Sequence, residues 1–140
     1  MNLNSKKIKI LIKETFKSLC VNEKIAELVA EGLINTSLRG IDTHGIRLLP
    51  HYVKAIELGR LNPKPDIKFN ETSKSTGILD ADHTLGYAAG VLAMERAIEL
   101  AESSGAGFVS VKNSSHCGAL AYPSLKASEK DMLGLGFTHA

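Results

Sequence analysis

The sequence predicts an α/β (α+β) fold, in which an all-helical N-terminal part precedes part of a mixed sheet. Apolar residues recur at three- and four-residue steps through residues 6–59, as in amphipathic helices. Pro63 and Pro65 interrupt that pattern, and after them short apolar runs alternate with helical stretches. We therefore expect an N-terminal helical domain over residues 1–62 and the first part of an α/β domain over residues 63–140.

Three helices are expected in the first domain. Residues 6–19 place apolar side chains on one face, with lysines between them. A second helix begins after Asn22, a favourable N-cap, and stops at Gly40, which suits the left-handed conformation at a helix end. These two should pair as a hairpin. Residues 43–59 should form the third helix, because Pro50 lies close enough to the first turn to be tolerated.

The second domain should alternate strands with helices after a connector at residues 61–66. The expected strands are 67–69, 76–79, 108–111 and 133–137, and the expected helices are 86–104 and 118–130. Gly105 should close the helix that starts at Gly86. Because the last expected strand lies next to Ala140 without a polar tail, we expect this chain to be the N-terminal portion of a longer protein.

Composition excludes several classes of protein. The 140 residues include 17 Lys and Arg against 15 Asp and Glu, a net charge of +2, and no Trp. Nucleic-acid-binding proteins concentrate basic and aromatic residues, so no nucleic-acid partner is expected. No apolar run is long enough for a membrane span or a secretory leader, so no membrane partner is expected either. Cys20 and Cys117 then indicate reduced thiols in a cytoplasmic protein.

The first candidate site is the segment 40–52, which contains several reactive side chains. If a helix starts near His44, then Arg47 and His51 follow it at helical spacings of three and seven residues. Arg47 could hold a carboxylate through paired hydrogen bonds while His44 exchanges a proton with a neighbouring oxygen. The alternative is a capped helix start with an exposed histidine and arginine.

The second candidate site is the polar segment 113–118, between an expected strand and an expected helix. Loops in this position hold ligands in α/β proteins, and the amides that open the next helix attract anions. His116 is therefore well placed to act as an acid or a base. The alternative is a polar connection that caps the helix. A Cys117 nucleophile with His116 as its base is less favourable, since adjacent side chains do not converge.

No metal site is expected. Asp80, Asp82 and His83 lie close together, but the chain has no helical His-x-x-x-His, no Cys-x-x-Cys and no loop of alternating acidic ligands. An acidic turn that caps the helix near Thr84 explains these residues better. The glycine pairs 105/107 and 134/136 also lack the strand–glycine–helix order of a Rossmann phosphate loop.

Taken together, these segments resemble the type-2 malate/L-lactate dehydrogenase family along the whole chain. The most specific matches are Arg39-Gly40-Ile41-Asp42-Thr43-His44-Gly45 with Leu49, Pro50 and Tyr52, Asp80-Ala81-Asp82 before Gly86, and His116-x-Gly118 with Tyr122. The resemblance implies a non-Rossmann, nicotinamide-dependent fold that uses NAD or NADP, in agreement with the missing phosphate loop.

The resemblance also implies a function. The whole protein would be an oxidoreductase that transfers a hydride between NAD or NADP and a 2-hydroxy acid/2-oxo acid pair of malate, lactate or ureidoglycolate type. It would be a cytoplasmic homodimer at full length, acting on a small-molecule substrate. The alternative is an inactive N-terminal fragment that serves only as a structural or partner-binding piece.

Site residues follow from the same resemblance. The implied acid/base residues are His116 and His44, the implied substrate contacts are Arg47, Tyr52 and Ala140, and the implied cofactor contacts are His44, Gly118 and Tyr122. Two positions depart from the family pattern. The usual arginine falls at Leu48, one residue after Arg47, and His139-Ala140 stands where relatives often have Asn or Ser. One helical position turns a side chain by about 100°, so Arg47 would not project as the usual arginine does, and the substrate could differ from malate or lactate.

Overall fold

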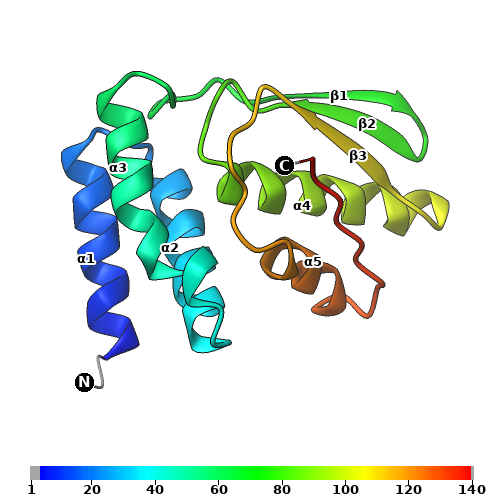
Figure 1. Cartoon of the computed structure of the whole chain (residues 1–140). Helices are drawn as coiled ribbons and strands as arrows, with labels where there is room; N and C mark the ends of the chain where they lie inside the picture. The colour runs from blue at the N-terminus through cyan, green and yellow to red at the C-terminus, as the bar shows by residue number, and fades with distance from the viewer. Residues whose placement is uncertain (1–3, 140) are drawn as a thin grey trace.

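The computed structural model describes residues 4–139, in which three N-terminal helices lie beside a layer formed by a small sheet and two further helices (Figure 1). The mixed α/β fold class is therefore confirmed. One hydrophobic core joins both parts: Phe16 and Leu33 of the first helices, Tyr52 of the third, and Tyr87 and Val91 of the fourth are buried in the same cluster. The site described below lies where these two parts meet.

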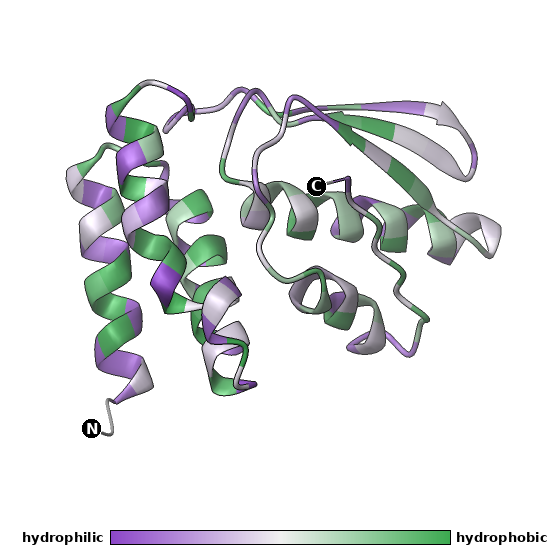
Figure 2. Cartoon of the chain, in the orientation of Figure 1, coloured by the Kyte–Doolittle hydropathy of each residue, from purple (hydrophilic) through white to green (hydrophobic). Residues whose placement is uncertain are grey.

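The first two helices form the expected hairpin. Helix α1 spans Ser5–Ser18 and helix α2 spans Glu23–Leu38. The predicted N-cap is confirmed, because the Asn22 side chain accepts hydrogen bonds from the amides of Lys24 and Ile25. Gly40 follows α2 with a φ of 79°, the left-handed conformation expected there. Figure 2 shows hydrophobic residues alternating with polar ones along both helices, as the periodicity predicts.

The expected single helix over residues 43–59 is wrong. The segment contains two short 3₁₀ turns, η1 (Asp42–His44) and η2 (Ile46–Leu48), followed by helix α3 (Leu49–Glu57). Gly45 breaks the helix with a ψ of −141° because it packs against α2, where a Cβ would overlap the Ser37 side chain. Pro50 lies in the first turn of α3, where its missing N–H costs little. Helical spacing therefore does not relate His44 to Arg47.

A three-stranded mixed sheet follows. Its strands are β1 (Lys68–Ser73), β2 (Thr76–Asp80) and β3 (Phe108–Lys112), in that order across the sheet. Strands β1 and β2 are antiparallel, whereas β2 and β3 are parallel. Helix α4 (Gly86–Ser104) connects the parallel pair and covers one face of the sheet. As predicted, Gly105 ends α4 in the left-handed conformation.

The C-terminal part differs from expectation in two ways. Helix α5 spans Ala121–Ser128, shorter than the expected 118–130, because Gly118 has a φ of 64° that no helix allows. The expected strand at 133–137 is wrong. That segment has no strand neighbour, and Gly134 packs against the backbone of Ser124 in α5. An alternating pattern favours extended backbone, but only a paired neighbour makes it a strand. Among residues 4–139, no helix has an apolar stretch long enough to cross a membrane.

Candidate active site

The structure brings the two candidate segments together. His44 lies at the end of η1, His51 and Tyr52 lie in α3, and His116 lies in the loop after β3. The His44 and His116 rings stack with centroids 5.6 Å apart and planes 27° apart. The His51 ring stands edge-on to His116 at 6.3 Å. The His116 ring therefore lies next to two other imidazoles, one from η1 and one from α3.

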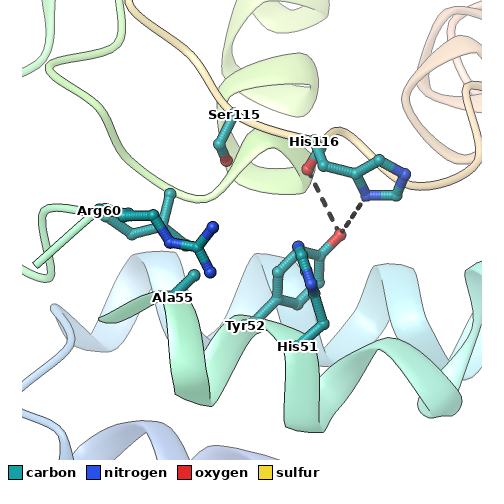
Figure 3. A pocket seen from close by; sticks show the side chains of 7 residues that line it. His51, Tyr52, Ala55, Arg60, Ser115 and His116 are labelled. Atoms are coloured by element: carbon teal, nitrogen blue, oxygen red, sulfur yellow. Dashed lines mark hydrogen bonds between the residues drawn. The ribbon is translucent and has the colours of Figure 1, made fainter. Parts of the chain in front are cut away.

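Tyr52 orients the His116 ring from below (Figure 3). Its side chain is buried, and its hydroxyl oxygen lies 3.2 Å from His116 Nδ1 and 3.3 Å from the His116 carbonyl oxygen. When Nδ1 carries the hydrogen, it donates to the tyrosine oxygen, the hydroxyl donates to the carbonyl, and Nε2 is free to exchange a proton. When Nε2 carries it, Nδ1 instead accepts from the Tyr52 hydroxyl and from the Gly118 amide at 3.4 Å. Both neutral tautomers of His116 are thus accommodated.

The surroundings favour the neutral form of His116. Burial lowers the pKa of its ring, and the positive charges that His44 and His51 can carry lower the pKa further. Burial also raises the pKa of Tyr52 above its usual value, so this hydroxyl remains protonated. At neutral pH the pair is therefore an uncharged base held by an uncharged hydroxyl.

A hollow of about 170 Å³ opens beside His116. Its lining consists of His51, Tyr52, Ala55, Arg60, Leu61, Ser115 and His116 (Figure 3). Pockets for larger organic ligands usually measure about 300–1,000 Å³. The hollow therefore suits a small acid or part of one, but not a dinucleotide.

Tyr87 holds the two histidine-bearing segments together. Its side chain is fully buried at the start of α4, and its hydroxyl donates to the His44 carbonyl oxygen at 2.6 Å. The same oxygen lies 3.0 Å from the Ala119 amide and 2.9 Å from the Thr36 hydroxyl, both of which can donate to it. Nothing in the sequence pattern distinguishes Tyr87 from an ordinary core residue. The only available signal is that a buried tyrosine hydroxyl needs a polar partner.

Ser115 fixes the loop that carries His116. Its hydroxyl accepts a hydrogen bond from the Gly86 amide at 2.9 Å and donates to the Thr84 carbonyl at 2.9 Å. It thereby caps α4 from a distant part of the chain. The expected cap from the acidic turn is wrong, since Asp80 and Asp82 lie too far back along the chain and bind other groups.

The acidic turn instead ties loops together. Asp80 accepts from the Asn113 side chain at 3.0 Å and pairs with Lys112 at 3.1 Å. The Asn113 hydrogen bond, followed by bonds from the Asp82 amide and Lys112, lowers the pKa of Asp80 to about 2. Asp82 accepts from the Asn62 side chain at 2.8 Å. Within residues 4–139, no group of three or more His, Cys, Asp or Glu residues is arranged to hold a metal ion.

The other residues predicted to contact substrate or cofactor differ in burial and in their contacts. Arg47 is exposed in η2 and does not line the hollow. Gly118 packs so closely on the Tyr87 ring that a Cβ would overlap it. Tyr122 is buried, its hydroxyl donates to Glu31 at 3.0 Å, and burial raises its pKa. Substrate contact by Arg47 and cofactor contact by Gly118 and Tyr122 remain predictions, and Ala140 lies outside the described residues.

Comparison with known proteins relates this chain to one family. The family model described as malate/L-lactate dehydrogenase matches residues 3–140. L-sulfolactate dehydrogenase of Methanocaldococcus jannaschii is 38% identical over 139 residues, covering 99% of this chain and 40% of that protein. Ureidoglycolate dehydrogenase (NAD(+)) of Escherichia coli strain K12 is 29% identical over 135 residues, covering 96% of this chain and 39% of that protein.

A solved structure agrees with these relatives. Malate dehydrogenase from Pyrococcus horikoshii OT3 superposes with a TM-score of 0.89 and 32% identity, covering 93% of this chain and 37% of that one. The present chain thus spans about 40% of the length of the curated relatives it matches.

Proposed function

Because the chain belongs to the malate/L-lactate dehydrogenase family, we propose that the whole protein interconverts a 2-hydroxy acid and a 2-oxo acid with NAD or NADP. One observation supports this most directly. His116, held by Tyr52 and stacked on His44, borders a hollow of the size of a small acid. An acid/base group beside a small polar hollow is what alcohol oxidation requires of a protein.

His116 exchanges the proton of the substrate hydroxyl. In the oxidative direction its neutral ring accepts that proton at Nε2, while Nδ1 donates to the Tyr52 hydroxyl oxygen and keeps the ring in place. In the reductive direction the protonated ring returns the proton to the same oxygen. Bound nicotinamide supplies or accepts the hydride. The lowered pKa of His116 keeps the ring neutral at neutral pH, which is the form that accepts the proton in the oxidative direction.

The described residues fit the substrate end of this reaction better than the cofactor end. The stacked His44 and His116 rings can contact a flat nicotinamide, which is the proposed role of His44 towards the cofactor. The hollow beside His116 is too small for a dinucleotide, and the Tyr87 ring occupies the space next to Gly118. The choice of a nicotinamide is supported by the family and by the name of the ureidoglycolate relative, which includes NAD(+). A cytoplasmic homodimer is proposed on the same family grounds.

The test is a His116→Ala variant of the whole protein. Turnover of NADH or NADPH with pyruvate, oxaloacetate and related 2-oxo acids should fall by roughly 10²- to 10⁴-fold, the usual effect of removing a general acid or base. A Lys74→Ala variant is the control, because Lys74 is exposed in the turn between β1 and β2 and lines neither of the two hollows near Arg60. Near wild-type turnover in folded His116→Ala protein would refute the assignment.

A second measurement separates an enzyme from a structural fragment. NADH and NADPH fluorescence should change on titration with the whole protein, and a 2-oxo acid should compete with or enhance that change. A whole protein that binds neither cofactor and turns over no 2-oxo acid would favour the structural or partner-binding alternative.

A further inference from the structure

The hollow beside His116 contains a cation that the family resemblance does not assign. The Arg60 side chain extends into it, between Ala55 and Ser115 (Figure 3). We propose that Arg60 holds the carboxylate of the substrate while His116 handles its hydroxyl. This inference rests on the proposed function and assigns it a specificity-determining residue.

The backbone fixes where Arg60 can reach. Helix α3 ends in a tight turn in which Gly59 has a φ of 67° and the Arg60 amide donates to the Ala55 carbonyl at 2.9 Å. The next residue, Leu61, is buried in the core, and the Asn62 amide donates to the His83 carbonyl at 3.0 Å. Arg60 is therefore anchored on both sides, and its Cα is fixed relative to the helix that carries His51 and Tyr52.

The charge of Arg60 is available to a ligand. Among residues 4–139, no Asp or Glu carboxylate forms an ion pair with Arg60, whereas Arg96 pairs with Glu99 at 2.6 Å. The remaining ionisable side chains that line the hollow are His51, Tyr52 and His116, and none of them is an acidic group at neutral pH. An anion entering the hollow therefore meets only neutral or positive groups. A guanidinium also offers two parallel N–H donors that match the two oxygens of a carboxylate.

Arg60 differs in position from Arg47, the arginine that the sequence led us to expect at the carboxylate. Both side chains are exposed, but Arg60 lines the hollow and Arg47 does not. Leu48, the residue after Arg47, packs against the core. A neighbouring hollow of about 540 Å³ shares Arg60 and Leu61 with the first. Asp82 and His83 also line that hollow, so an acid bound through Arg60 has space for an uncharged or cationic substituent that extends away from His116.

The test compares Arg60→Met, Arg60→Lys, Arg47→Met and Lys54→Met in the whole protein. Lys54 is an exposed cation of α3 that does not line the hollow, so it is the matched control. Arg60→Met should raise KM for 2-oxo acids by roughly 10- to 100-fold, the loss expected for a charge-assisted pair. The dissociation constant for NAD(P)H should change less than about twofold. Arg60→Lys should recover part of the KM because it keeps the charge, and Lys54→Met should match wild type.

Two kinetic results and one binding result would overturn the inference. An unchanged KM in Arg60→Met excludes Arg60, and a rise in KM confined to Arg47→Met assigns the carboxylate to Arg47 instead. A calorimetric titration of the whole protein with malonate, a dianion that cannot be reduced, separates this inference from the proposed function. If wild type binds malonate, Arg60→Met does not, and no 2-oxo acid is turned over, then the anion site stands and the proposed function fails. Equal malonate binding in both proteins overturns the anion site whatever the activity.

Discussion

Replacing Tyr87 with Phe removes one oxygen from the centre of the molecule. That oxygen bonds to the His44 carbonyl at 2.6 Å, the Ala119 amide at 3.0 Å and the Thr36 hydroxyl at 2.9 Å. The ring itself fits the same space as Phe, so packing on Gly32 and Gly118 is preserved. The variant therefore tests the loss of these hydrogen bonds without a change in packing.

The size of the stability loss depends on whether each group that loses its hydrogen bond to Tyr87 can form one with water instead. Thr36 is 1% exposed and has no other partner available, which costs about 1–3 kcal/mol. His44 and Ala119 are half-buried, so each regains part of its hydrogen bonding from solvent. We expect the free energy of unfolding to fall by about 2–4 kcal/mol, a large share of the roughly 5–15 kcal/mol typical of a domain.

Urea unfolding followed by circular dichroism measures this loss. Adding Thr36→Val to Tyr87→Phe should cost less than the sum of the two single changes, because the double variant leaves no buried hydroxyl unpaired. A loss below about 1 kcal/mol in Tyr87→Phe, or strict additivity with Thr36→Val, would show that this hydroxyl does not hold the segments together.

Two further predictions concern the histidines and the glycines. The pKa of His116, measured by NMR, should lie below 6.5 and should rise in His44→Gln, since a neighbouring positive charge is lost; a value at or above 6.5 in wild type would contradict the burial argument. The pKa of His116 is lower in the folded than in the unfolded chain, so its contribution to the free energy of unfolding should be complete above pH 6.5 and should be lost as the pH falls towards the folded-state pKa. The urea midpoint should therefore decrease over this pH range, and it should decrease less in His116→Gln. Gly118→Ala should lower the free energy of unfolding by roughly 2–5 kcal/mol, through its positive φ and overlap with Tyr87. Gly105→Ala, with a φ of 84° but open space around it, should cost only about 1 kcal/mol, and equal losses would exclude the overlap as a cause.

Local patterns predicted those features whose causes are local. The capping of α2 by Asn22 and the end of α4 at Gly105 depend on residues within one turn of the helix end, so both are confirmed. The sequence indicated His116 by its place between a strand and a helix and His44 by a helical spacing that is wrong, and the structure brings the two rings together. Their roles as acid or base remain predictions.

The features that sequence could not predict depend on distant contacts. Gly45 interrupts the third helix because α2 packs against it, and Ser115 caps a helix that begins far away in the chain. Arg60 is an exposed cation like several others, and only the fold shows that it lines the hollow beside His116. The alternating pattern at 133–137 describes a backbone preference, whereas a strand requires a neighbour that no local pattern specifies.

The Tyr52–His116 hydrogen bond closes a loop of 64 residues, and this has a consequence for how the protein folds. The chain entropy lost in joining such distant positions is about 4 kcal/mol from the loop length alone, whereas a single hydrogen bond returns only about 1 kcal/mol. The bond therefore forms after the core has already brought α3 and the His116 loop into contact. A partly folded chain can hold its helices and still lack the assembled histidines. Titration of His116 thus reports completion of the native state, which helical content alone does not.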